Sequence, residues 1–229
     1  MRDAGLAPHR RTRVSPTLAA LAFLLAGAVP GTNGEPGWRV EAALGAAHSF
    51  GSTLSVEQAG FPSLEIEAEW DNRNFESPLY YGLRVACGDT RGAWALRFVH
   101  LKVYLANPSP EVERFSVSHG YNLLTVERSF PWSGFDLWAG VGIVIAHPES
   151  TVRRQTKPET EGGPFGGGYY VTGPTGALAI DRRLQLGQRF ALVPEVRFTF
   201  SRARVPIAGG EASVPNASIH VLLGLELGF

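Results

Sequence analysis

Cysteine, basic charge and long apolar runs are all scarce in this sequence, and each scarcity excludes a class of protein. Cys87 is the only cysteine among 229 residues, which excludes an internal disulfide and a zinc site built on cysteines. Without residues 1–28 the chain has 17 basic and 20 acidic residues, so it lacks the basic surface of a nucleic-acid-binding protein. Because no later stretch reaches about 18 consecutive apolar residues, no helical membrane span is expected in the rest of the chain.

The N-terminus has the composition of an export signal. Arg2, Arg10, Arg11 and Arg13 precede the apolar stretch 18–29, which is too short for a helix that crosses a bilayer. A basic start, a short apolar segment and small residues at 26 and 28 are typical of a secretory signal peptide. We therefore expect residues 1–28 to be a signal peptide cut after Ala28, with Gly31 as a second cleavage position. An uncleaved membrane anchor is the alternative interpretation.

The rest of the chain is apolar in an alternating way. Hydrophobic residues make up 44% of the sequence, yet the mean hydropathy is only −0.02 because polar residues are interleaved with them. The last segment shows this most clearly: its odd-numbered positions from Ile219 to Phe229 are apolar, and its other face contains Ser218, His220 and Glu226. Period-2 alternation over 12 residues predicts a strand longer than is usual in soluble proteins. Similar alternation covers 64–70, 135–146 and 192–200.

Ten strands are expected in total. The less regular candidates are 38–48, 53–58, 78–87, 93–105, 115–128 and 168–182. This spacing predicts an all-β, closed, antiparallel up-and-down barrel, with ten strands favoured and eight as the alternative if 38–58 packs outside the wall. An even number places both ends of the barrel on the same side.

The connections between strands predict the direction of the barrel. Residues 147–167 and 203–216 are long, polar and rich in glycine or proline, whereas the links 131–134 and 186–188 are tight. Barrels of bacterial outer membranes have long outer loops and short periplasmic turns. We therefore expect 147–167 and 203–216 to be outer loops, and the last strand to end at Phe229 on the periplasmic side.

These patterns resemble the β-barrel proteins of Gram-negative outer membranes. In that family the last strand ends in an aromatic residue with alternate apolar positions, here Phe229, Leu227 and Leu225. The resemblance implies that residues 29–229 are an outer-membrane barrel in contact with lipid and lipopolysaccharide. It also implies that the barrel-assembly machinery recognises the final strand. The alternative is a secreted soluble β-sandwich or a lipocalin-like barrel, whose apolar rows point inward.

In a membrane barrel the polar row of each strand faces the lumen. An eight- or ten-stranded barrel is narrow, so its buried charges must pair with one another. We expect a lumen network in which three glutamates of 64–70 meet Arg84 and other cations, and this arrangement leaves no conducting pore. The expected members are Glu65, Glu67, Glu69, Arg84, His100, Lys102, Asp136, Glu195 and Arg197.

One segment suggests chemistry. His119 lies on an apolar row expected to face lipid, where a titratable residue is costly. Ser118 to Asn122 resembles, distantly, the His-x-Ser-Asn motif of PagL-type lipid A deacylases. The resemblance implies that His119 is the general base and Asn122 the motif asparagine of an acyl-ester hydrolase. Tyr121 stands where the nucleophilic serine belongs, and Ser118 would reach His119 only through a bulge near Gly120.

The favoured function is therefore a structural or surface-interaction role for a non-enzymatic barrel, with ester hydrolysis at His119 as the alternative. An interfacial histidine without chemistry is the simpler interpretation of His119. His147 and Glu149 supply only two ligands, fewer than a metal site requires, so no metal or other cofactor is expected.

Overall fold

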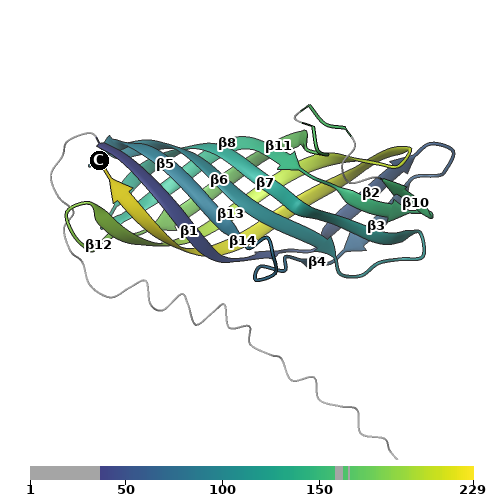
Figure 1. The fold of residues 1–229 in the computed structure, drawn as a ribbon, viewed down its shortest axis with the longest axis horizontal. Helices are drawn as coiled ribbons and strands as arrows, with labels where there is room; N and C mark the ends of the chain where they lie inside the picture. The colour runs from purple at the N-terminus through teal and green to yellow at the C-terminus, as the bar shows by residue number, and fades with distance from the viewer. Residues whose placement is uncertain (1–36, 158–161, 165) are drawn as a thin grey trace, which may run out of the picture.

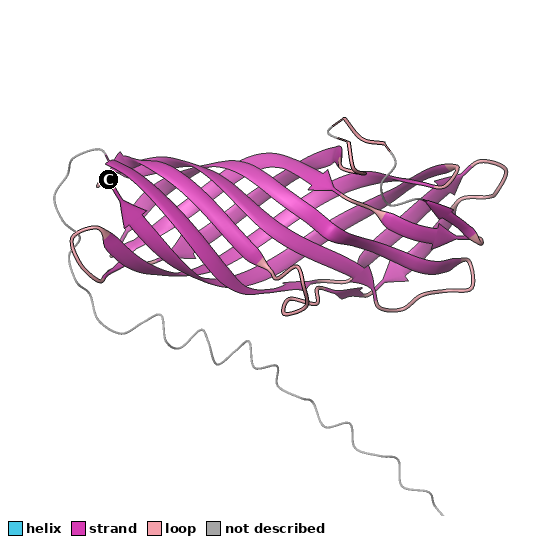
Figure 2. Cartoon of the chain, viewed as in Figure 1, coloured by secondary structure: helices cyan, strands magenta, loops and turns pink. Residues whose placement is uncertain are grey.

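The computed structural model describes residues 37–157, 162–164 and 166–229, and these residues fold almost entirely as strands (Figure 2). The predicted signal peptide lies outside the described residues. Within those ranges no helix is long and apolar enough to cross a membrane. The strands are β1 Gly37–Ser49, β2 Ser52–Gln58, β3 Leu64–Ala68, β4 Trp70–Asp71, β5 Tyr81–Asp89, β6 Gly92–Leu105, β7 Val112–Trp132, β8 Phe135–Ala146, β9 Glu149–Val152, β10 Gln155–Lys157, β11 Tyr170–Asp181, β12 Leu184–Gln185, β13 Phe190–Ile207 and β14 Gly210–Gly228.

Eight of these strands close a ring. The antiparallel order is β1, β5, β6, β7, β8, β11, β13 and β14, and β14 pairs with β1 from Arg39–Gly228 to Ser49–Ser218. The predicted closed antiparallel barrel is confirmed (Figure 1). The favoured count of ten is wrong, because 53–58 and 64–70 form the β2–β3 hairpin, which pairs with the tip of β14. Residues 38–48 belong to β1, which is itself a strand of the wall. The alternative of eight strands assumed that 38–58 packs outside the wall, and that assumption is wrong.

Three of the ring strands are much longer than a membrane crossing requires. β7 has 21 residues, β13 has 18 and β14 has 19, whereas a tilted strand crosses a bilayer in about 9–11 residues. Away from Phe229, the ends of β6, β7, β13 and β14 continue into a distal extension, completed by β2, β3, β4, β9 and β10. An apolar core fills this distal extension and includes Leu54, Trp70 and Phe115.

Strands occupy much of the two segments that were predicted to be outer loops. Residues 203–216 are not a loop, because β13 and β14 continue as a paired hairpin to Ile207 and Gly210. The first part of 147–167 is also a hairpin, formed by β9 and β10. Val205, Ala212 and Val214 are buried in the apolar core of the distal extension, which explains why these polar-looking segments form strands.

Phe229 lies at the end of the barrel that contains the tight turns. The backbone NH of Phe229 donates a 2.9 Å hydrogen bond to the carbonyl of Trp38 at the start of β1. The turn between β5 and β6 lies at the same end, because Gly88 pairs with Gly37. We call this the proximal end (Figure 1). Phe229 and Leu225 point outward and are exposed, as the alternation predicts.

Each ring strand also presents an apolar side chain on the outside of the barrel. The exposed fraction of these eight side chains ranges from 40% for Phe198 to 73% for Val141. Three tryptophans lie outside near the proximal end: Trp38, Trp94 and Trp132. We call the surface formed by these side chains and their outward neighbours the apolar band. One such residue from each strand, in ring order, is Leu44, Leu83, Leu96, Val126, Val141, Leu178, Phe198 and Leu223.

The interior changes character along the barrel. In β7, Tyr121 and Leu123 point into an apolar part of the interior. The next two inward residues, Thr125 and Glu127, point into a polar part. The strand does not change its inward face between these positions. The polar half is surrounded by the exposed apolar band, and the apolar half adjoins the distal extension.

Candidate functional site

The polar half of the interior is a network of ion pairs. Arg84 binds Glu41, Asp181 at 2.6 Å and Glu195 at 3.4 Å. Arg97 joins Glu41 at 2.7 Å to Glu195 at 3.2 Å. These side chains are almost completely buried, so each charge has its partners inside the barrel.

Arg197 on β13 extends this network to Glu127 on β7. Its guanidinium donates two hydrogen bonds to Glu127, at 2.6 and 2.9 Å, and a third to Glu195 at 2.9 Å. The added Cβ of an alanine at Gly224 would lie 2.7 Å from the Glu41 carboxyl carbon, so a glycine there leaves room for the network. The buried side chains of this network therefore occupy the polar half of the interior.

The structure brings together three predicted members of this network and adds four. Arg84, Glu195 and Arg197 lie in it, while the sequence reasoning missed Glu41, Arg97, Glu127 and Asp181. The available signal was that Glu41 and Arg97 are each charged residues flanked on both sides by apolar residues. Asp136 lies at the proximal mouth, 3.8 Å from Arg183, rather than in the network.

The prediction for the three glutamates of residues 64–70 is wrong. Glu65, Glu67 and Glu69 are exposed on the outside of the distal extension. In the distal extension the apolar row of each strand faces the core, so Ala68 and Trp70 point inward and the glutamates point outward. Alternation alone does not say which row is inward.

His100 and Lys102 also do not face the lumen. Their neighbours Val99 and Leu101 point into the apolar interior, so His100 and Lys102 point outward. Lys102 is nevertheless covered, because its Nζ donates a 2.8 Å hydrogen bond to the carbonyl of Glu76 in the segment before β5.

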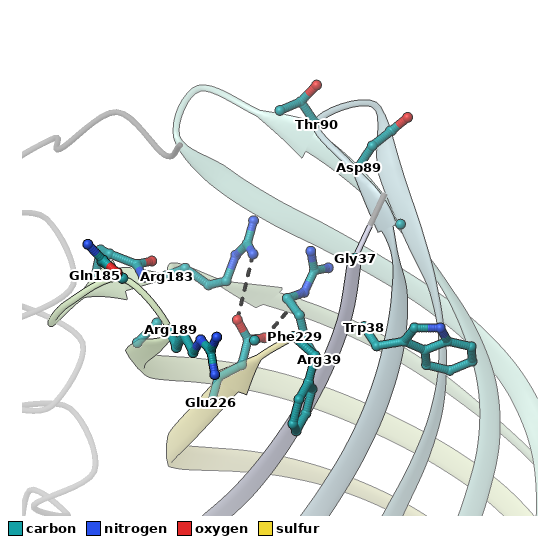
Figure 3. Close-up of a pocket in the computed structure, with 14 residues that line it drawn as sticks. Gly37, Trp38, Arg39, Asp89, Thr90, Arg183, Gln185, Arg189, Glu226 and Phe229 are labelled. Atoms are coloured by element: carbon teal, nitrogen blue, oxygen red, sulfur yellow. Dashed lines mark ion pairs between the residues drawn. The ribbon is translucent and has the colours of Figure 1, made fainter. Parts of the chain in front are cut away.

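A hollow of about 400 Å³ marks the proximal mouth of the barrel (Figure 3). Glu226 stands at its centre, 3.5 Å from Arg39 and 3.6 Å from Arg183. These three side chains place a charged cluster at the proximal mouth.

A bulge in β7 creates a second polar centre on the outside of the barrel. Leu101 pairs with Tyr121 and Val103 with Val117, so Lys102 alone lies opposite the three residues 118–120. Gly120 has a φ of +132°, which a residue with a side chain rarely adopts. The bulge turns His119 outward, with 53% of its side chain exposed.

This bulge brings Ser118 and His119 to one carboxylate. The Ser118 hydroxyl donates a hydrogen bond to Glu149 Oε1, and His119 Nδ1 lies 3.0 Å from the same oxygen. The Ser118 hydroxyl and His119 Nδ1 are 3.3 Å apart. Glu149 begins β9 and lies beside Ser118 because Ser116 pairs with it across the strands.

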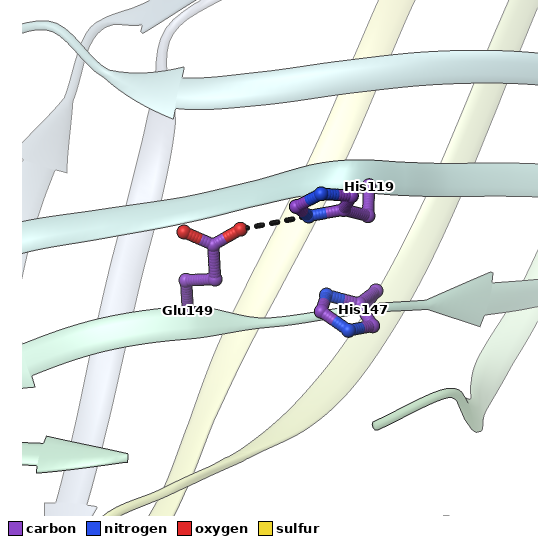
Figure 4. A group of neighbouring side chains, drawn as sticks. All are labelled: His119, His147 and Glu149. Atoms are coloured by element: carbon purple, nitrogen blue, oxygen red, sulfur yellow. Dashed lines mark hydrogen bonds and ion pairs between the residues drawn. The ribbon is translucent and has the colours of Figure 1, made fainter. Parts of the chain in front are cut away.

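His147 completes what we call the bulge cluster: Ser118, His119, His147 and Glu149. Figure 4 shows the last three of these side chains. The ring centroids of His119 and His147 are 4.9 Å apart, and the ring centroid of Tyr169 is 4.8 Å from that of His147. Arg114 binds the other oxygen of Glu149 at 2.6 Å. Sequence reasoning named His147 and Glu149 but did not connect them to His119, because only the bulge places these residues together.

The carboxylate of Glu149 is stabilised in its ionised form. Burial alone would raise the pKa of the Glu149 carboxyl. Hydrogen bonds from Ser118 and His119, together with the charge of Arg114, outweigh that effect and hold its pKa below the ordinary value. The cluster therefore contains an ionised carboxylate beside two imidazoles and a hydroxyl.

The cluster borders a lateral hollow of about 520 Å³ on the outside of the wall. His100, His119 and Asn122 supply its polar groups, and His100 Nδ1 lies 2.8 Å from Asn122 Oδ1. The remaining lining is apolar or aromatic: Pro78, Tyr81, Phe98, Ile145 and Tyr169. Tyr81, Phe98 and Ile145 continue the outward rows of the apolar band, so the lateral hollow lies at its distal edge.

The predicted face of His119 was right for the wrong reason. The row expected to carry it outward includes Val117, Tyr121 and Leu123, and all three point into the interior. His119 is outside only because of the bulge at Gly120. Asn122 shares the lateral hollow with His119 but pairs with His100.

The contacts of His119 differ from those of a catalytic triad. In a triad one imidazole nitrogen faces the nucleophile and the other faces the carboxylate. Here His119 Nδ1 is the atom nearest both Ser118 and Glu149. Glu149 is itself hydrogen-bonded to Ser118, so it is the base in direct contact with the hydroxyl.

No family model and no curated protein matches this sequence. Among solved structures, the outer-membrane protein AlkL, determined in lipid bilayers, is 14% identical, with a TM-score of 0.47 over 89% of this chain and 95% of AlkL. The outer-membrane protein OprG of Pseudomonas aeruginosa is 11% identical, with a TM-score of 0.45 over 83% of this chain and 96% of OprG. Neisserial surface protein A is 8% identical, with a TM-score of 0.38 over 86% of this chain and all of that protein. The barrel architecture of this chain is defined by its own strand pairing.

Proposed function

We propose that this protein is an integral outer-membrane barrel that does not conduct and that presents the distal extension as a surface for contacts. The observation that carries the proposal is the exposed apolar side chain on every one of the eight ring strands, around an interior whose polar half contains a network of ion pairs. A soluble barrel has the opposite arrangement, and a continuous apolar outer surface is expected in contact with lipid.

The aromatic residues support the same orientation in a membrane. Trp38, Trp94 and Trp132 are each about 60% exposed near the proximal end. Tryptophan is enriched where membrane and water meet, so these side chains suit the proximal interface. With the tight turns on the periplasmic side, the distal extension points away from the cell. Outer-membrane lipid and lipopolysaccharide are then the surrounding partners, and the row ending in Phe229 is available to the assembly machinery.

Membrane fractionation and gel mobility test this proposal. The processed protein should be found in the outer-membrane fraction, and its mobility should change on heating in detergent, as for a folded barrel. In a planar bilayer the purified protein should give no conductance above background, because ion pairs occupy the polar half of its interior and apolar side chains the other half. Recovery in the soluble periplasmic fraction would refute the membrane location, and stable single-channel steps would refute the filled interior.

A second candidate function is acyl-ester hydrolysis, favoured by the convergence of Ser118, His119 and Glu149 at the edge of the apolar band. Ser118 Oγ would attack the ester carbonyl while Glu149 accepts its proton. The departing alcohol takes up that proton as the acyl-serine forms, and water then releases the fatty acid. The apolar lining of the lateral hollow suits an acyl chain.

Purified protein in detergent micelles with lipid A tests this candidate. Release of free fatty acid should be lost in Ser118→Ala and reduced in His119→Gln, and it should be unchanged in Ser63→Ala, which alters an exposed serine. If the acyl content of lipid A does not change with the unaltered protein, or if release continues in Ser118→Ala, this candidate is wrong.

A further inference from the structure

We propose that His119, His147 and Glu149 form a binding site for a divalent transition-metal cation, with Zn²⁺ as the probe. The proposal goes beyond a structural role for the barrel, and it does not depend on ester hydrolysis. One ligand atom from each of the three side chains can be chosen so that all lie within 4.8 Å of one another.

His147 supplies an independent observation that points to a ligand. Its side chain is only 5% exposed, and among the described residues its Nδ1 has no hydrogen-bond partner. A buried polar atom without a partner costs about 1–3 kcal/mol, so such atoms call for an explanation. The ring of His147 lies beside the His119–Glu149 pair, where a cation would satisfy it (Figure 4).

The surrounding contacts hold the backbone of the two histidines and the carboxylate of Glu149 in place. The backbone NH of His147 donates a 3.0 Å hydrogen bond to the carbonyl of Gly120, and the hydroxyl of Tyr169 donates one of 3.2 Å to the carbonyl of His119. Arg114 binds Glu149 Oε2 and leaves Oε1 toward His119. Arg114 therefore orients the carboxylate from outside the ligand set.

The donor set selects the class of metal. Two imidazoles and one carboxylate suit zinc and its transition-metal neighbours, whereas calcium and magnesium prefer sites built from oxygen. Ligands at about 2.0–2.2 Å from a tetrahedral ion are separated by about 3.4 Å, so the atoms must close by at most about 1.4 Å. The exposed side chain of His119 can supply most of that movement.

Three protein ligands leave a coordination position open. His119 also lines the lateral hollow, so the open side of the site adjoins apolar and aromatic residues. A second ligand of the metal would therefore approach from the edge of the apolar band.

Titration of the metal-depleted, tag-free full-length protein in detergent micelles with ZnCl₂ tests the site. Calorimetry should show one equivalent of zinc bound, and the thermal midpoint should rise with zinc. His147→Gln and His119→Gln should each weaken binding by at least about tenfold. His48→Gln, which alters an exposed histidine on β1, should bind as the unaltered protein does.

Two features keep the outcomes separate. His119→Gln alters a half-exposed side chain, so it tests the site even if His147→Gln fails to fold, as judged by heat-modifiable gel mobility. Ser118→Ala should retain zinc binding whether or not lipid A is hydrolysed, so failure of the hydrolase candidate leaves the metal proposal standing. The absence of stoichiometric binding, or full binding in His119→Gln, would overturn the proposal.

Discussion

Arg197 on β13 and Glu127 on β7 form a two-point ion pair across the inside of the barrel, at 2.6 and 2.9 Å. Their strands are not neighbours, since β8 and β11 lie between them in the ring. The pair therefore joins two separate parts of the wall, and both side chains are almost completely buried.

Breaking this pair should destabilise the barrel strongly. Glu127→Ala leaves Arg197 with one carboxylate fewer in a buried setting, and we expect a loss of about 3–5 kcal/mol in the free energy of unfolding. Urea titration of the protein in lipid vesicles, followed by tryptophan fluorescence, measures this loss. Glu211→Ala removes the exposed pair with Arg204 and should cost less than about 1 kcal/mol. Equal effects of the two substitutions would contradict the role given to the buried network.

Gly120→Ala should disrupt the bulge cluster. The new Cβ would collide with the Asn122 side chain, and the positive φ adds strain of about 1–3 kcal/mol. We expect zinc affinity to fall while the barrel still forms, because the bulge lies at the edge of the apolar band. Calorimetry and heat-modifiable mobility report the two properties. Gly187→Ala, in a turn with open space, is the control, and unchanged zinc affinity in Gly120→Ala would show that the bulge does not organise the site.

Leu54→Ala should loosen the distal extension. Leu54 is fully buried in its apolar core, and removal of such a side chain costs about 2–5 kcal/mol. Limited proteolysis of the protein in vesicles should then show new cleavage within 53–71, while the ring strands remain protected. Phe75→Ala, at a side chain that is 81% exposed, should not increase cleavage. If Leu54→Ala is as resistant as the unaltered protein, the distal extension does not depend on this core.

The alternation of β14 predicted the most, because its sequence alternates through the whole apolar band. Leu223 and Leu225 face outward and His220 and Glu226 inward, as expected from the sequence. The distal extension could not be separated from the barrel in the same way. Its strands alternate equally well, but their apolar row packs into the core of the distal extension, so that row is the inner one. This reversal explains both the count of ten strands and the placement of Glu65, Glu67 and Glu69 in the lumen.

The bulge cluster was only partly predictable. Ser118, His119 and the need for a bulge near Gly120 follow from the local sequence. The carboxylate does not, because Glu149 lies 31 residues from Ser118 and reaches it only through the pairing of β9 with β7. His147 joins them because the chain leaves β8 directly beside Gly120.

The most direct test of the central claim, that the apolar band faces lipid, is tryptophan quenching by brominated lipids. Trp94 lies outside the barrel at 60% exposure, while Trp138 points into the interior at 4% and donates a hydrogen bond to Asp181. Two variants should each retain one of these residues, with the other tryptophans changed to phenylalanine. In vesicles of brominated phosphatidylcholine, fluorescence of the Trp94 variant should be strongly quenched and that of the Trp138 variant little changed. Equal quenching of both, or quenching of Trp138 alone, would contradict the account.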